Sequence, residues 1–417
     1  MELIVQQSCP SCGADIVGDE ADRLLQCPFC GVRHYRVTPG LSRFVLPDKA
    51  PGHIPREELL YAPYLHFKGS IFSCNGKQVQ QRVVDVTHLG AGDAGPGLPL
   101  SLGLRSQAMP VSLLASPIPG NFFRQQLKAE AIFEMAAQSS ALVPEQTPEP
   151  LYHRAFIGET ISCLYLPLYI HDGTLYDAVT NKALAKKVSG DELGKRCLPF
   201  QKQWMPRFLA TLCPACGGSL AGERDSLVLS CHNCHSSWEE AEGALRSLAW
   251  QRVTSLHKDA RYLPFWKIEV KASGVEMDSF GDFLRLTNQP LVVRPEHDRM
   301  ALCFWVPAIK LRPQVFLNLA RNLTLSQKRL PAGEAVMAGE LFPVTLPRSE
   351  AIQALKTVLA EAAVNKRDVL PLLPEIKFQP LATELVYLPF NDNGHDWVQE
   401  QIMLAIPGSV LRFGRSL

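Results

Sequence analysis

The sequence predicts an α+β protein made of two tandem copies of one unit, a small four-cysteine lobe followed by a larger, mainly antiparallel β module with one or two helices. First, eight of the 12 cysteines form four Cys-x-x-Cys pairs, and these pairs repeat at one spacing. Second, the segment that follows the first two pairs resembles the segment that follows the last two pairs. Third, 32 of 417 residues are proline, which disfavours a helical bundle because proline breaks a helix interior.

The four-cysteine lobes are predicted from the cysteine spacing. Fourteen residues separate the two pairs of the first lobe and 14 separate those of the second, close to the spacing of a four-cysteine metal site. A tight turn between two cysteines lets both thiolates reach one tetrahedral ion at about 2.3 Å. The candidate metal ligands are Cys9, Cys12, Cys27, Cys30, Cys213, Cys216, Cys231 and Cys234.

The turns between the paired cysteines hold small or turn-forming residues. They read CPSCG at 9–13, CPFCG at 27–31 and CPACGG at 213–218, where the glycine after the second ligand permits a positive φ. These segments resemble the zinc-ribbon family, in which one metal is held between two such turns on short antiparallel strands. The resemblance covers only the two lobes. It implies two structural Zn²⁺ ions per chain, with strands at 24–26 and 227–230 entering the second turns.

The fourth turn, CHNCH at 231–235, departs from this pattern. His232 and His235 replace the proline and the glycine, and either could compete as a ligand, although Cys231 and Cys234 complete the spacing of the first lobe.

Iron is the alternative metal, because the ribbons also resemble rubredoxins. Disulfides are disfavoured without an export signal, and a thioredoxin-like redox site by the presence of four pairs. The unpaired cysteines are expected to be buried structural thiols: Cys74, Cys163, Cys197 and Cys303.

The segments after the two lobes indicate an internal duplication. YAPYLHFK at 61–68 is similar to YLPFWKIE at 262–269, and residues 159–170 are similar to 382–392. The predicted organisation is a zinc ribbon at 1–40, a β-rich module at 41–187, a linker at 188–207, a second ribbon at 208–240 and a second β-rich module at 241–417.

The larger modules are predicted to be mainly antiparallel sheets. Alternating and β-branched runs at 79–86, 161–170 and 306–311 predict strands. Helices are expected at 121–138 and 349–366, which are rich in good helix formers. A third helix is expected after the second ribbon, where Ser237 and Glu240 match a capping box.

The sequence contains no motif that predicts a catalytic residue. GAGDAGPG at 90–97 matches Gly-x-Gly-x-x-Gly, but prolines follow it and no βαβ unit is evident, so a surface loop is expected. Histidine and aspartate are adjacent at 171–172, 297–298 and 395–396, where the polar context predicts surface turns. We therefore predict neither catalytic residues nor any cofactor besides zinc.

The charge of the chain argues against recruitment of nucleic acid. The whole chain has a net charge of +1. Three arginines face five acidic residues in 1–40, and one arginine faces five in 209–245, whereas phosphate binding requires cationic side chains. No signal-like segment opens the chain and no run of 18 apolar residues occurs. We expect a soluble cytoplasmic protein without a membrane span.

These observations favour a non-enzymatic zinc-binding scaffold or adaptor whose two duplicated modules bind a protein partner. Two alternatives remain open. One is a nucleic-acid-associated zinc-ribbon factor with a basic face assembled from distant residues. The other is an iron-binding, rubredoxin-like electron-transfer protein.

Overall fold

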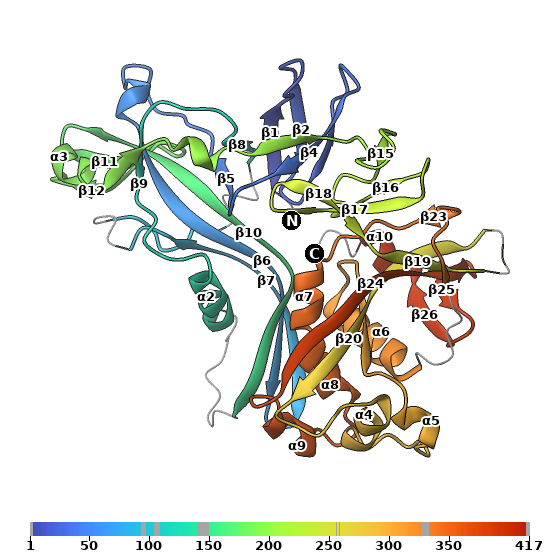
Figure 1. Cartoon of the computed structure of the whole chain (residues 1–417). Helices are drawn as coiled ribbons and strands as arrows, with labels where there is room; N and C mark the ends of the chain where they lie inside the picture. Colours follow the sequence, from blue (N-terminus) through green and yellow to red (C-terminus); the bar gives the residue numbers. More distant parts are fainter. Residues whose placement is uncertain are drawn as a thin grey trace. The chain divides into compact units, whose positions relative to one another are not determined.

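Figure 1 shows a computed structural model of the chain, which describes residues 3–92, 97–103, 109–139, 150–255, 257, 259–326 and 333–413. The fold is mixed α/β and dominated by strands. It divides into two compact units. The first unit comprises Met1–Lys68, Val84–Leu142 and Glu159–Ala210, and the second comprises Gly69–Val83, Val143–Gly158 and Thr211–Leu417.

Strands are the main regular elements in the first 210 residues. They are β1 (Ile4–Ser8), β2 (Asp15–Asp19), β3 (Leu24–Gln26), β4 (Arg33–Val37), β5 (Ser42–Val45), β6 (Leu60–Asn75), β7 (Gln78–Leu89), β8 (Val111–Leu113), β9 (Asn121–Phe123), β10 (Leu151–His171), β11 (Thr174–Asp177), β12 (Lys182–Lys186), β13 (Cys197–Pro199) and β14 (Arg207–Ala210). The helices are α2 (Ala131–Ser139), α3 (Gly190–Gly194) and the 3-10 turns Arg56–Glu58 and Lys202–Trp204.

Helices are more frequent after residue 210. The strands are β15 (Leu220–Ala221), β16 (Val228–Cys231), β17 (Ser236–Ala241), β18 (Ala244–Leu248), β19 (Trp250–Val253), β20 (Arg261–Ser273), β21 (Cys303–Pro307), β22 (Gly333–Glu334), β23 (Glu340–Leu341), β24 (Lys377–Asp392), β25 (Asp396–Gln399) and β26 (Leu404–Pro407). The helices are α4 (Phe280–Leu286), α5 (Pro295–Asp298), α6 (Pro313–Ser326), α7 (Arg348–Gln353), α8 (Leu355–Ala362), α9 (Lys366–Val369), α10 (Gly408–Phe413) and the 3-10 turn Leu370–Leu372.

The main sheet of the first unit has the order β13-β9-β6-β10-β5-β8-β1-β2, with β7 beside β6 and the β11–β12 hairpin beside β10. Strand β6 is buried over most of its length because both of its faces are covered. Leu60, Ala62 and Tyr64 enter one hydrophobic cluster, whereas Tyr61 enters another. This alternation is the two-residue period of a strand that lies between two cores.

The main sheet of the second unit has the order β21-β20-β24-β19-β22, with β23 beside β20 and β26 beside β25. Strands β20 and β24 pair antiparallel from Arg261 opposite Phe390 to Ser273 opposite Lys377. Helix α6 packs on β21 and on α8 (Figure 1). The core includes Trp266, whose indole N–H donates to the Leu346 carbonyl at 2.9 Å. The hydrogen bond satisfies the one polar group of this buried side chain.

Several predicted elements are confirmed. The expected strands at 24–26, 79–86 and 161–170 correspond to β3, β7 and β10, and 227–230 corresponds to β16. The helical stretch 349–366 forms α7, α8 and the start of α9. The strand expected at 306–311 is β21, which begins earlier and ends at Pro307.

One predicted helix begins too early, and another is wrong. Residues 121–123 form β9, and the helix begins only at 131, because β9 pairs with β6 and β13 and buries Phe122 and Phe123. Ser237 lies in β17, which pairs with β16 and β18, and is not a helix cap. In both places strand pairing outweighs local helix propensity. The expectation of one or two helices per module also fails in the second unit, which contains α4, α6, α7 and α8.

Residues 188–207, which we expected to form a linker, contribute to the first unit. They contain α3 and β13, and β13 pairs antiparallel with β9 from Cys197 opposite Phe123 to Pro199 opposite Asn121. None of the helices in the described ranges is long and apolar enough to cross a membrane.

Candidate metal centres

The first four cysteines come together between two pairs of strands. Cys9 and Cys12 lie in the turn between β1 and β2, and Cys27 and Cys30 lie between β3 and β4. Cys9 Sγ is 3.8 Å from Cys30 Sγ, and Cys12 Sγ is 3.6 Å from Cys27 Sγ. All four sulfurs lie within 4.8 Å of one another.

The second four cysteines form an equivalent group. Cys213 and Cys216 lie between β14 and β15. Cys231 is the last residue of β16, and Cys234 lies in the turn between β16 and β17. Cys213 Sγ is 3.6 Å from Cys234 Sγ, and Cys216 Sγ is 3.5 Å from Cys231 Sγ. These sulfurs also lie within 4.8 Å of one another.

The glycines after the second cysteine explain how the turns form. Gly13, Gly31 and Gly217 have φ of 75°, 71° and 73°. Each glycine N–H donates to the carbonyl of the first cysteine of its turn, at 2.9, 3.0 and 2.8 Å. His235 takes the same left-handed conformation in the fourth turn, with φ of 56°. This conformation is costly for a residue with a Cβ.

His235 is held by contacts other than a metal. Its Nδ1 accepts a hydrogen bond from the Met337 N–H at 3.2 Å, and its carbonyl accepts one from the Trp250 indole at 3.0 Å. His232 is exposed and lines a cavity of about 200 Å³. Neither histidine joins the sulfur group, which leaves the four cysteines as the candidate ligands.

Both groups fit a tetrahedral metal ion. Bonds of about 2.3 Å to a central ion place tetrahedral sulfurs about 3.8 Å apart, and the observed separations are 3.5 to 3.8 Å. A disulfide requires about 2.05 Å between sulfurs. The two groups therefore have the donor set and the spacing of Cys₄ metal sites.

Hydrogen bonds lower the pKa and favour the thiolate form at Cys27 in the first group and at Cys213 and Cys216 in the second. At Cys27 the backbone N–H of Cys30 lowers the pKa against the effect of burial, and the N–H of Phe29 adds to it, giving a pKa of about 6. At Cys213 burial raises the pKa, but hydrogen bonds from Ser236 and from neighbouring backbone N–H groups outweigh it and bring the pKa to about 6. Thiolates are the species that bind metal.

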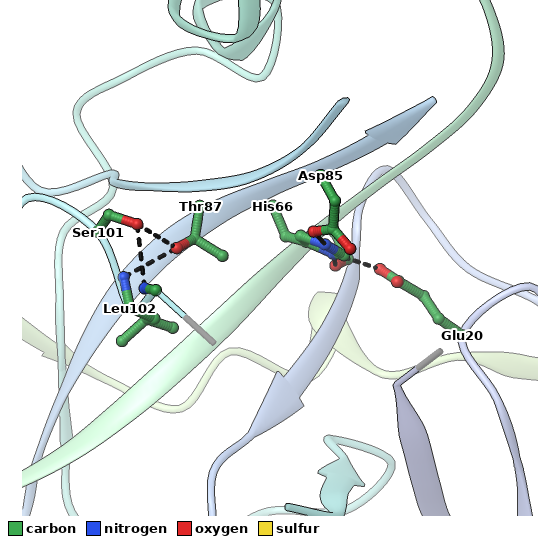
Figure 2. A network of polar contacts seen from close by, with 8 residues as sticks. Glu20, His66, Asp85, Thr87, Ser101 and Leu102 are labelled. Carbon is green, nitrogen blue, oxygen red and sulfur yellow. Dashed lines mark hydrogen bonds and ion pairs between the residues drawn. The ribbon is translucent and has the colours of Figure 1, made fainter. Parts of the chain in front are cut away.

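A buried histidine that the sequence analysis missed lies near the first group. His66 on β6 lies between two carboxylates (Figure 2), with Nδ1 3.2 Å from Glu20 Oε1 and Nε2 3.0 Å from Asp85 Oδ1. His66 is 1% exposed, and the side chain of Glu20 is 4% exposed. Arg36, also buried, donates to the Glu20 carbonyl at 2.9 Å. The network ties the loop after β2 to the long strands β6 and β7.

This network is structural in its geometry. Ser162 Oγ lies 3.4 Å from His66 Nδ1, so serine, histidine and aspartate occur together. Ser162 is fully buried, however, and no substrate carbonyl could reach its hydroxyl. Burial lowers the pKa of His66, but the charges and hydrogen bonds of Glu20 and Asp85 more than compensate and raise it to about 10. A buried charged imidazole is thus paired on both sides.

The other histidine-aspartate pairs have different surroundings. His171 and Asp172 form an exposed contact of 3.4 Å, as a surface turn would. His297 contradicts the expected surface turn: it is buried, its Nδ1 accepts from the Arg294 N–H, and its ring packs against Phe280. His297 is buried because α5 packs against α4, whereas Asp298 is exposed.

His395 lines a cavity of about 510 Å³ in the second unit. Its other polar walls include Arg261 and Asp392. The Arg261 guanidinium is paired with Glu340 at 2.7 Å and lies over the Trp397 ring. The Gly-x-Gly-x-x-Gly match cannot be traced in full, because 93–96 lie outside the described residues.

Comparison with known proteins adds no relative. No known protein family, no curated protein and no solved structure matches the chain.

Replacing Cys12 by serine is expected to unfold the first lobe and leave the second intact. A structural Zn²⁺ contributes about 10–16 kcal/mol to small zinc-binding peptides, and the Cys12 substitution removes one of its four ligands. Limited proteolysis followed by mass mapping should find new cleavage within 1–40. The Cys303→Ala variant serves as the control because Cys303 lies in neither group. An unchanged digestion pattern for Cys12→Ser would contradict the assignment.

The variants His232→Ala and His235→Gly are expected to keep the same number of bound ions as the parent protein. Glycine tolerates the left-handed conformation of position 235, although it removes the acceptor for the Met337 N–H. Native mass spectrometry reports the metal count. Loss of one ion from either folded variant would mean that a histidine is a ligand.

The variant His66→Gln is expected to destabilise the first unit by about 3–5 kcal/mol, because it removes the positively charged partner of the buried Glu20 carboxylate and of Asp85. Hydrogen exchange of peptides from β6 and β7 measures the effect. His257→Gln is the matched control: His257 also contacts a glutamate, Glu400, but both side chains are more than half exposed. Equal protection loss in the two variants would show that the His66 network contributes little.

The contribution of His66 should depend on pH. Its pKa is about 10 in the folded chain and about 6.5 in an unfolded one. The stabilisation is therefore complete below pH 6.5 and is lost as the pH rises through 10. The difference in exchange between parent and His66→Gln should shrink from pH 7 to pH 10, and a difference that grows with pH would refute the charged assignment.

Proposed function

We propose that the chain is a non-enzymatic zinc-binding scaffold in which two duplicated modules, each a zinc ribbon followed by a β sheet, bind a protein partner. The observation that carries the proposal is the pair of Cys₄ groups of matching geometry, each followed along the chain by strands whose pairings correspond. Each metal would supply cross-linking without redox chemistry, which suits a structural role.

The strand pairings support the duplication. In the first sheet β10 is parallel to β5, β6 is parallel to β9, and β5 is antiparallel to β8. In the second sheet β24 is parallel to β19, β20 is parallel to β23, and β19 is antiparallel to β22. The hairpin β11–β12 follows β10 as β25–β26 follows β24. Strands β5 to β12 thus correspond in order to β19 to β26.

Backbone conformation supports the same correspondence. Asn181 and Met403, 222 positions apart, have positive φ of 55° and 54°. Asp172 and Gly394, also 222 apart, have φ of 47° and 96°. A methionine rarely adopts this conformation. Its presence there indicates that the turn geometry was inherited with the copy.

The side chains between the long strands have diverged. His66 faces Ser162 in the first sheet, and the equivalent positions in the second sheet hold Lys267 and Glu384, whose charged groups are 4.0 Å apart. Both copies place a basic group opposite a polar one, but only the first is sealed from solvent. A scaffold with two similar but unequal modules can present two different surfaces to its partners.

The lobes favour a protein over a nucleic acid as partner. Exposed apolar side chains flank the cysteines: Phe29 is 74% exposed, Val32 41% and Leu212 58%. In the second lobe Glu223 and Glu242 are exposed. Apolar groups among acidic ones fit protein surfaces better than phosphate.

The proposal is tested with untagged chain purified from its own cells under reducing conditions. Native mass spectrometry should find two zinc ions per chain and a bound protein, and stripping the metal with a chelator should release that protein. The Cys12→Ser and Cys216→Ser variants separate the contribution of each lobe.

Three results would contradict the proposal. Iron in the lobes would support electron transfer. Salt-dependent binding to DNA or RNA, measured by fluorescence anisotropy, would support the nucleic-acid alternative. A folded chain without metal would exclude a metal-dependent scaffold altogether.

A further inference from the structure

The second cysteine group receives hydrogen bonds from side chains. The Ser236 hydroxyl lies 3.0 Å from Cys234 Sγ and 3.5 Å from Cys213 Sγ. The Asn233 amide donates to Cys216 Sγ at 3.3 Å. Three of the four sulfurs of this group therefore contact a polar side chain.

The direction of the Ser236 hydrogen bond follows from its other partner. The Trp238 indole N–H donates to Ser236 Oγ at 2.8 Å. Because an indole nitrogen only donates, the serine oxygen must accept, and its own proton is free to point at a sulfur. Trp238 is 9% exposed and lies in β17, so this relay is held in place by the sheet. A thiolate can only accept from it.

The first cysteine group lacks these donors. Asn233 and Ser236 are the residues two and five positions after the third cysteine of the second group. In the first group these two positions hold Phe29 and Val32, which have no polar side-chain atom. Their exposure leaves this side of the group open to solvent.

The position equivalent to Trp238 also differs in the first lobe. It holds His34, whose Nε2 lies 2.8 Å from the Ser11 hydroxyl and does not contact a sulfur. The Ser11 backbone N–H donates to Cys9 Sγ at 3.4 Å. Among the described residues of this lobe, only backbone N–H groups and the other cysteines contact the sulfurs.

Hydrogen bonds to metal-bound thiolates affect how firmly the metal is held. One divalent ion with four thiolates carries a net charge of about −2, which donors partly offset. Donors also fix the orientation of the ligands and must be broken before a sulfur can leave. Loss of such outer contacts typically costs about 10–100-fold in metal affinity.

We infer that the two sites hold metal unequally: the second is the retained site and the first is the exchangeable one, with Ser236 and Asn233 as the positioning residues that create the difference. The inference rests on the proposed zinc binding. It makes the folding of the first lobe, with its exposed Phe29 and Val32, responsive to metal supply, while the second lobe stays assembled.

The test treats zinc-loaded full-length chain with a chelator, 4-(2-pyridylazo)resorcinol, and alkylates samples at intervals with iodoacetamide. Peptide mapping then reports which cysteines have been freed. We expect the cysteines of 9–30 to become reactive at least about 10-fold sooner than those of 213–234. Equal rates, or faster release from the second group, would overturn the inference.

Variants assign the difference to the side chains. Ser236→Ala should speed release from the second group, whereas Ser236→Thr keeps the hydroxyl and should restore the parental rate. Val32→Ser transplants the donor and should slow release from the first group. In the cobalt-substituted protein, Ser236→Ala should shift the sulfur-to-metal charge-transfer band, which a merely structural change elsewhere would not move.

The outcomes separate this inference from the proposed function. Two ions in the untreated chain with equal release, or Ser236 variants that stay folded and release metal like the parent, would refute the inequality and leave the scaffold proposal standing. An untreated chain without metal would refute both.

Discussion

Four thiolates within 4.8 Å of one another constrain each small lobe. Negative sulfurs at this distance repel unless a cation lies among them, so metal binding and folding of the lobe form one equilibrium. Next to the first group the apolar cluster is small. It consists of Ile16 and the two buried cysteines, Cys9 and Cys27, with Ala14 packed against it, whereas the other buried apolar side chains of the lobe, such as Leu24 and Tyr35, lie outside this cluster. A lobe of this size depends on a cross-link.

The larger modules are stabilised differently. Strand β6 is covered on both faces, and two buried polar side chains of the modules are paired: Trp266 with a carbonyl, and His66 with two carboxylates. The His66 network matters for the lobe as well, since Glu20 follows β2 directly and Asp85 lies in β7. A metal bound by the four cysteines would fix the two turns of the first lobe, and the ion pairs of His66 connect the end of β2 to β6 and β7.

The sequence was sufficient for features that depend on local spacing. Both cysteine groups, the glycine turns after them and the long strands could be predicted because each is determined by a few neighbouring residues. The helix expected at 121–138 failed because strand pairing of Phe122 and Phe123 depends on distant residues. His66 was missed because a single histidine in an apolar segment gives no sign of carboxylates at positions 20 and 85. The role of His235 depends on Met337, 102 residues away.

The central claim is that each lobe is a four-sulfur metal site, and X-ray absorption at the zinc edge of the purified chain tests it most directly. The account predicts four sulfur neighbours at about 2.3 Å around each zinc and no nitrogen shell. A nitrogen contribution would place a histidine in the first coordination sphere. Absorption at the iron edge in place of zinc would contradict the structural role of the metal itself.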